Sequence, residues 1–111
     1  MVRAAFFDID GTLVSHATKT VPTSTRQALA TLRQSGVLTA VATGRHCIEL
    51  DQLPIAGIPF DGFVTLNGQL CLDAHRTVYA ATPIDPDDTR MLAAAFAEKE
   101  LPILLVERDR S

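Results

Sequence analysis

Three short apolar runs, each followed by polar residues or glycine, predict three strands of one sheet. They cover residues 3–8, 37–42 and 62–66. Each run is apolar almost throughout instead of alternating with polar residues, which is typical of strands that a parallel sheet buries on both faces. We therefore expect the carboxyl ends of these runs to meet at one edge of the sheet.

Two segments between these runs predict helices. Residues 22–36 carry an apolar stripe, and Ser24 and Gln27 have the spacing of a capping box at a helix start. Gly36 stands where a C-terminal cap belongs. Residues 45–53 predict a second, shorter helix that ends before a proline.

The third run is followed by a hairpin pattern. Asn67 and Gly68 lie between alternating apolar residues, which is a strong signal for a tight turn between antiparallel strands. The return strand is expected at residues 69–73. A further strand is expected at residues 77–81, after another short turn.

The last part of the sequence predicts one more helix and one more strand. Residues 85–99 begin with aspartates that suit a helix N-terminus and continue with alanine-rich helix formers. Residues 102–107 are apolar and predict a strand. The order of the elements predicts an α/β fold with parallel βαβ units, a Rossmann-like sheet whose ligands bind beyond the carboxyl ends of the strands.

Composition excludes several classes of function. The chain has 111 residues, 47% of them hydrophobic, and a formal net charge of −3. This balance argues against disorder and gives no reason to expect a nucleic acid or a membrane as partner. No segment predicts a membrane span or a signal peptide, so we expect a cytoplasmic protein. Cys47 and Cys71 lack the spacing of metal ligands; their number allows one disulfide, but free, buried thiols are expected.

Two carboxylates after the first run carry the most informative chemistry. Asp8 and Asp10 are followed by Gly11 and Thr12. A carboxylate at the end of a buried strand is costly unless something pairs with it. Successive amides around Gly11 and Thr12 suit an anion-binding nest. A divalent cation reconciles a bound anion with the neighbouring carboxylates, and Mg²⁺ prefers oxygen ligands of this kind.

These groups allow a definite reaction on phosphorus. Asp8 attacks the phosphorus atom and forms an aspartyl-phosphate. Asp10 gives a proton to the leaving oxygen and then takes one from the hydrolytic water. The metal and the amides stabilise charge on the transferring group.

Three motifs of the chain resemble one enzyme family. DIDGTL after the first run, ATGR after the second and VTLNGQLCLD around the third resemble the haloacid dehalogenase-like hydrolase superfamily, and within it the Cof-type phosphatases. The resemblance covers residues 2 to about 82. It implies that residues 1–82 are the N-terminal part of the Rossmann-like hydrolase core. It also implies that residues 83–111 begin an inserted α/β cap domain.

The resemblance implies roles for the residues that match the motifs. Asp8 is the nucleophile and a Mg²⁺ ligand. Asp10 is the general acid and base, and its backbone carbonyl also binds the metal. Thr43 holds the phosphoryl group through its hydroxyl, and Gly44 lies close by.

Two further residues are assigned to the mouth of the site by the same resemblance. Arg45 and Asn67 are expected to contact substrate or phosphate there. The implied reaction is Mg²⁺-dependent hydrolysis of a phosphate monoester of a small metabolite, typically a sugar phosphate. The sequence leaves the natural substrate and the oligomeric state open.

The chain also departs from the family pattern. The family uses a lysine that bridges phosphate and nucleophile, and an acidic segment that completes the metal site. The chain has two lysines, Lys19 and Lys99, and no acidic motif of that type follows them, so neither feature is assigned. We therefore expect the chain to be the N-terminal part of a longer protein and to be catalytically inactive in isolation.

A receiver-like signalling module is the second hypothesis, in which a phosphorylated aspartate regulates a partner. Such a module is also α/β and also uses aspartate, Mg²⁺ and a threonine. Its phosphorylated aspartate should end the third strand, and a lysine should end the fifth. The carboxylates here follow the first strand, which favours the hydrolase.

Overall fold

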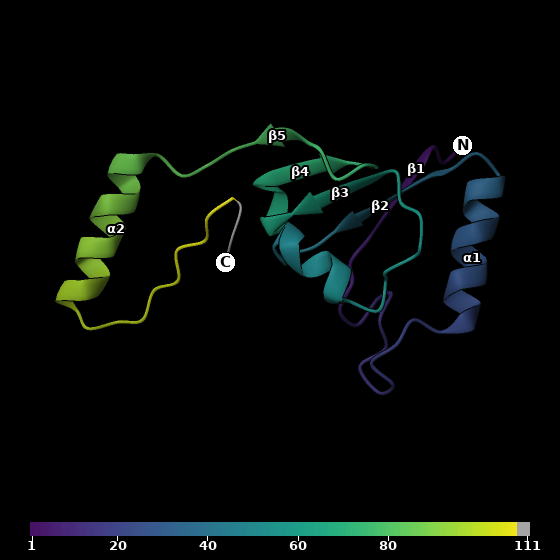
Figure 1. Cartoon of the computed structure of the whole chain (residues 1–111), viewed down its shortest axis with the longest axis horizontal. Coiled ribbons are helices and arrows are strands. Elements are labelled where there is room, and N and C mark those ends of the chain that lie inside the picture. The colour runs from purple at the N-terminus through teal and green to yellow at the C-terminus, as the bar shows by residue number, and fades with distance from the viewer. Residues whose placement is uncertain (109–111) are drawn as a thin grey trace.

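The computed structural model describes residues 1–108, which form one five-stranded sheet flanked by helices (Figure 1). The strands are β1 (Ala4–Phe7), β2 (Leu38–Ala42), β3 (Gly62–Thr65), β4 (Leu70–Asp73) and β5 (Val78–Ala81). They lie in the order of the sequence. The first three run parallel, and β4 and β5 are antiparallel to their neighbours. This arrangement confirms the predicted α/β class, the parallel start of the sheet and the later hairpins.

Strand β1 lies at the edge of the sheet, and the prediction that it is buried is wrong. Phe6 is 63% exposed and Phe7 is only partly buried. Within the described residues only β2 pairs with β1, so one side of the strand lies open. Burial begins just after the strand, because Ile9 and Leu13 are almost fully enclosed.

Helix α1 (Thr23–Gln34) ends as predicted but begins differently. Its N-cap is Pro22, which has no side-chain capping bond, so the capping box expected from Ser24 and Gln27 is wrong. Gly36 follows the helix with a φ of +82°, a conformation that a residue with a Cβ rarely adopts.

The connection between β2 and β3 contains the short helix expected there, and it is a 3-10 helix. This helix, η1, spans Cys47–Gln52. Its first turn is closed by a capping box in which His46 Nδ1 accepts the N–H of Ile48, and Glu49 Oε2 accepts the N–H of His46. A box of this kind fixes both side chains against the backbone.

The predicted hairpin is present between β3 and β4. It turns through a 3-10 segment, η2 (Leu66–Gly68), in which Asn67 has a φ of +55° and Gly68 a φ of +98°. Asparagine and glycine tolerate this left-handed region better than other residues, which explains the turn.

Helix α2 (Pro86–Glu98) begins at Asp85, whose carboxylate accepts the N–H of Asp87, as the sequence predicts. The strand expected at residues 102–107 is not formed. Leu104 is 79% exposed, and no described strand lies beside this segment to complete its backbone hydrogen bonds. In Figure 1, α2 lies at the opposite end of the molecule from α1.

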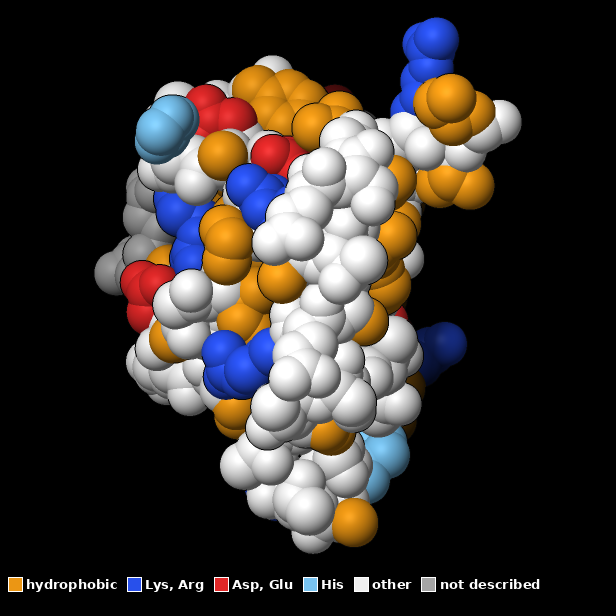
Figure 2. Space-filling view, turned by 90° about the vertical axis from the view of Figure 1, so that its right-hand side faces the viewer, with side chains coloured by type: hydrophobic (Ala, Val, Ile, Leu, Met, Phe, Trp, Pro, Cys, Tyr) orange, Lys and Arg blue, Asp and Glu red, His pale blue; other side chains and the backbone are white. Residues whose placement is uncertain are grey.

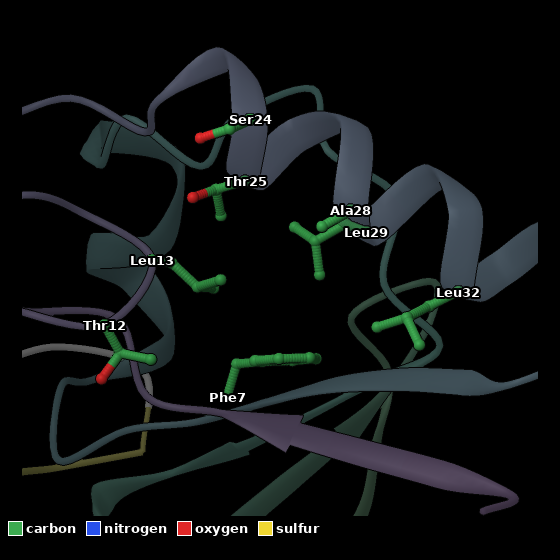
Figure 3. Close-up of a pocket in the computed structure, with 8 residues that line it drawn as sticks. All are labelled: Phe7, Thr12, Leu13, Ser24, Thr25, Ala28, Leu29 and Leu32. Carbon is green, nitrogen blue, oxygen red and sulfur yellow. The ribbon is translucent and has the colours of Figure 1, made fainter.

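Hydrophobic side chains are exposed beside α1 (Figure 2). Below that helix lies a pocket of about 280 Å³ between α1 and the end of β1. Its apolar wall includes Phe7, Leu29 and Leu32, which point into the same space (Figure 3). Its polar lining consists of three hydroxyl side chains, those of Thr12, Ser24 and Thr25.

Cys47 and Cys71 are both free thiols, as predicted, but each is only partly buried, so the expected burial is wrong. None of the helices in residues 1–108 combines the length and the apolar character needed to cross a lipid bilayer.

Candidate active site

The carboxyl ends of β1, β2 and β3 meet at one edge of the sheet, as expected. Phe7 pairs with Val41, and Val41 pairs with Phe63, so the three strands end side by side. Backbone hydrogen bonds continue across the loops that follow. The N–H of Thr43 donates to the carbonyl of Val64 at 2.8 Å. Most of the polar residues singled out in the sequence lie on these loops.

A tight turn holds the loop after β1. The carbonyl of Ile9 accepts the N–H groups of Thr12, Leu13 and Val14 at 2.9 to 3.2 Å, and the N–H of Gly11 donates to the carbonyl of Val14 at 2.9 Å. The amides of Gly11 and Thr12 are therefore engaged inside the loop. The anion-binding nest expected from these two amides is not formed in this structure.

Gly11 is required by this turn for two reasons. Its φ is +79°, which is unfavourable for a residue with a side chain. A Cβ added at this position would lie 2.4 Å from Nε2 of His16, whose ring packs against the glycine. The glycine therefore determines both the shape of the loop and the position of the imidazole.

Asp8 directly follows β1 and is exposed. Its Oδ1 accepts the N–H of Ile9 at 2.8 Å, which fixes the orientation of the carboxylate. A carboxylate has two oxygens and several lone pairs, so this single bond leaves Asp8 free to accept more. An oriented and accessible carboxylate suits both a nucleophile and a metal ligand.

Asp10 is held by Arg45 in a two-point ion pair. Nε of Arg45 lies 2.8 Å from Oδ2 of Asp10, and Nη2 lies 3.0 Å from Oδ1. The hydrogen bond from Arg45 holds the pKa of the Asp10 carboxyl below its usual range, although burial acts in the opposite direction. The charges of His16 and Lys19 lower this pKa by smaller amounts. Arg45 was expected to contact substrate or phosphate, and in this structure its guanidinium pairs with Asp10.

Arg45 also faces a second carboxylate, which the sequence analysis missed. Nη1 of Arg45 lies 3.5 Å from Oε1 of Glu49. The other oxygen of Glu49 accepts the N–H of His46 at 2.8 Å and is thereby held in place. The spacing of His46 and Glu49, three residues apart at a helix start, is the signal from which this contact can be anticipated.

Thr43 and Gly44 follow β2. The side chain of Thr43 is buried, and its Oγ1 accepts the N–H of Arg45 at 3.1 Å. That acceptor role leaves the hydroxyl proton available for another group. A Cβ at Gly44 would lie 3.1 Å from Oδ1 of Asn67, so the Asn67 amide lies close to this glycine. The structure thus brings Asn67, Gly44 and Thr43 together.

The donors that fit a metal ion are the Asp8 carboxylate and the backbone carbonyl of Asp10. No group of three or more histidines, cysteines or acidic residues that could hold a metal exists within the described part of the chain. Both donors are oxygens, and Mg²⁺ commonly binds one or two protein carboxylates while keeping several waters. Arg45 already pairs with the Asp10 carboxylate, which makes the backbone carbonyl the more available donor of that residue.

Comparisons by sequence and by structure find relatives in the same enzyme family. A profile of the haloacid dehalogenase-like hydrolase family matches residues 5–111. The phosphatase BT1666 from Bacteroides thetaiotaomicron superposes with a TM-score of 0.90 at 30% identity, over 99% of this chain and 40% of that protein. The subclass IIB sugar phosphatase BT4131 gives a TM-score of 0.79 at 34% identity, over 96% of this chain and 42% of that protein.

A curated relative adds a second named activity. The HMP-PP phosphatase of Cronobacter sakazakii (strain ATCC BAA-894) is 41% identical over 69 residues, which are 61% of this chain and 25% of the relative. The chain thus spans less than half the length of each of these three proteins.

The turn at Gly11 generates a stability prediction. Gly11→Ala should lower the free energy of unfolding by the cost of a left-handed alanine, about 1–2 kcal/mol. Because His16 is exposed and its ring can turn aside, the contact with the added Cβ should add a smaller cost, about 0.5 kcal/mol. Gly57→Ala is the matched control, because Gly57 has a φ of +85° with no atom within 4 Å of the added Cβ. Denaturant unfolding should rank Gly11→Ala as the more damaging, and His16→Ala should recover part of the difference. Equal losses at both glycines would refute the steric argument.

The ion pair at Asp10 generates a pH prediction. Because its pKa is lowered in the folded chain, Asp10 stabilises the fold above its unfolded pKa of about 3.9, and this contribution is lost as the pH falls through the folded value. Arg45→Gln should raise the Asp10 pKa, as followed by carboxyl NMR. The stability difference from the wild type should vanish at low pH. Arg76→Gln removes an arginine from a different ion pair and should leave the Asp10 pKa unchanged. An Asp10 pKa that does not respond to Arg45→Gln would contradict the assignment.

Proposed function

The chain belongs to the haloacid dehalogenase-like hydrolase family, and we propose on that basis that the whole protein is a phosphatase acting on phosphate monoesters of small metabolites. One observation carries the proposal. Asp8 presents an oriented carboxylate at the end of β1. On the loop that follows, Asp10 is ion-paired with Arg45, which comes directly after Gly44. The named relatives support the same class of reaction, since they are phosphatases.

In the first proposed step, Asp8 attacks phosphorus. An Asp8 oxygen forms a bond to phosphorus, the bond to the leaving oxygen breaks, and Asp10 delivers a proton to that oxygen. In the second step, water attacks phosphorus, Asp10 accepts a proton from that water, the bond between phosphorus and the Asp8 oxygen breaks, and phosphate is released. The hydroxyl of Thr43, oriented by the N–H of Arg45, donates to a phosphoryl oxygen in both steps.

Mg²⁺ is the proposed cofactor, held by the Asp8 carboxylate and the Asp10 backbone carbonyl. When bound, it neutralises negative charge on the transferring phosphoryl group. Thr43 and Gly44 follow β2, on the loop beside the one that carries Asp10. The Thr43 hydroxyl can therefore donate a hydrogen bond to the same phosphoryl group. The known preference of Mg²⁺ for oxygen donors supports this choice of metal.

Gly11 and Thr12 are proposed to serve the site through the shape of their turn, because their amides are engaged in it. Asn67 and Gly44 are proposed substrate contacts. They line a pocket of about 540 Å³ whose lining also includes Pro83, Ile84, Thr89 and residues 104–107.

We propose residues 1–82 as the beginning of the catalytic core and residues 83–111 as the beginning of a cap domain. The pocket between these two parts would then receive the leaving group, consistent with a small substrate such as a sugar phosphate. The family match favours this assignment over the receiver-like module.

Replacing the nucleophile tests the proposal. Asp8→Asn in the whole protein should reduce kcat for p-nitrophenyl phosphate by on the order of 10³-fold or more, because an amide cannot form the aspartyl-phosphate. Asp88→Asn, which changes an exposed carboxylate of α2, should retain activity. Turnover by a folded Asp8→Asn protein near the wild-type rate would refute the proposal. The same assay on the 111-residue chain tests our expectation that it does not turn over in isolation.

A further inference from the structure

Two carboxylates face the guanidinium of Arg45 from different elements. Asp10, on the loop after β1, takes Nε and Nη2 at 2.8 and 3.0 Å, while Glu49 of η1 lies 3.5 Å from Nη1. Arg45 stands between them, with its side chain 37% exposed. The guanidinium therefore needs only a small movement to exchange one carboxylate for the other.

The contact with Asp10 conflicts with the role proposed for that residue. A general acid must present an oxygen to the leaving group within hydrogen-bonding distance. Both oxygens of Asp10 are instead directed at Arg45. The observed arrangement is suited to a resting protein, and Arg45 has to move before Asp10 can reach the substrate.

We propose that Arg45 is a latch with two positions, holding Asp10 in the resting protein and transferring to Glu49 when Asp10 acts on the leaving group. This inference rests on the proposed phosphatase function and deepens it, because it assigns Glu49 as the positioning residue for the displaced arginine. Glu49 contacts no reacting atom in this account and acts only through Arg45.

The surroundings of Glu49 suit this role. One of its oxygens is fixed by the N–H of His46, so the other is held toward Arg45 without further ordering of the side chain. His46 is itself 2% exposed. Its Nδ1 accepts the N–H of Ile48, so its Nε2 donates to the carbonyl of Glu107 at 2.5 Å, which anchors the start of η1. Asp51, on the same short helix, pairs instead with Arg76 and therefore provides a control.

The test compares two substrates of the whole protein. An alkyl phosphate needs a proton on its leaving oxygen, whereas p-nitrophenyl phosphate releases a stable anion and needs little help from an acid. Glu49→Gln keeps the bond to the His46 N–H but removes the charge that attracts Arg45. The Glu49→Gln change should lower kcat/KM for the alkyl phosphate roughly tenfold more than for p-nitrophenyl phosphate. This factor is smaller than the full effect of general acid catalysis, because Asp10 itself is retained. Asp51→Asn should leave the ratio of the two values unchanged.

A second comparison separates a latch from a general weakening of the fold. In an Arg45→Gln background there is no guanidinium to move, so Glu49→Gln should no longer change the ratio between the two substrates. An unchanged ratio for Glu49→Gln in a wild-type protein that is active and is inactivated by Asp8→Asn would overturn the latch alone. The latch alone would also be overturned if Glu49→Gln lowered the ratio between the two substrates equally in the wild-type and Arg45→Gln backgrounds. An inactive wild-type protein, or an active Asp8→Asn variant, would overturn the phosphatase function and the latch together.

Discussion

The carbonyl of Ile9 accepts three backbone N–H groups, and the position of both carboxylates depends on this turn. Ile9 is fully buried, so the turn is anchored in the core although the strand before it lies at the sheet edge. Asp8 and Asp10 flank this buried residue on the two sides. The turn therefore fixes the spacing of the two carboxylates beyond the end of β1, and the buried Ile9 between them anchors it.

Electrostatics at the strand ends are balanced locally. The chain is acidic overall, yet Arg45, His16 and Lys19 all lower the pKa of Asp10, with the hydrogen-bonded Arg45 as the strongest cause. Asp8 is oriented by a backbone N–H from its own turn instead. The two carboxylates thus experience different surroundings, which is how one site can assign different roles to chemically identical groups.

Features that depend on a few consecutive residues were predictable from the sequence. The hairpin follows from Asn67 and Gly68 because both tolerate positive φ, and the start of α2 follows from Asp85, which caps its own helix. The position of Asp8 after the first strand, with the TGR segment after the second, was predictable for the same reason.

Features that depend on distant neighbours were not predictable in this way. The exposure of β1 is decided by which strands pair with it, and residues 102–107 form no strand although their composition favours one. The ion pair between Asp10 and Arg45 joins residues 35 positions apart, so only the folded loops show it. Glu49 was missed because its contact with Arg45 gains meaning only from the long-range pair of Arg45 with Asp10, although the spacing of His46 and Glu49 was a local signal for the capping box.

The central claim is that Asp8 carries the phosphoryl group during turnover, and it is tested most directly by trapping that intermediate. The whole protein would be mixed with substrate, quenched within a turnover, and treated with borohydride, which reduces an acyl phosphate at the modified aspartate. Peptide mass spectrometry then locates the reduced residue. The account predicts reduction at position 8 and at no other carboxylate. Product formation without reduction at position 8, or with reduction at position 10, would contradict it.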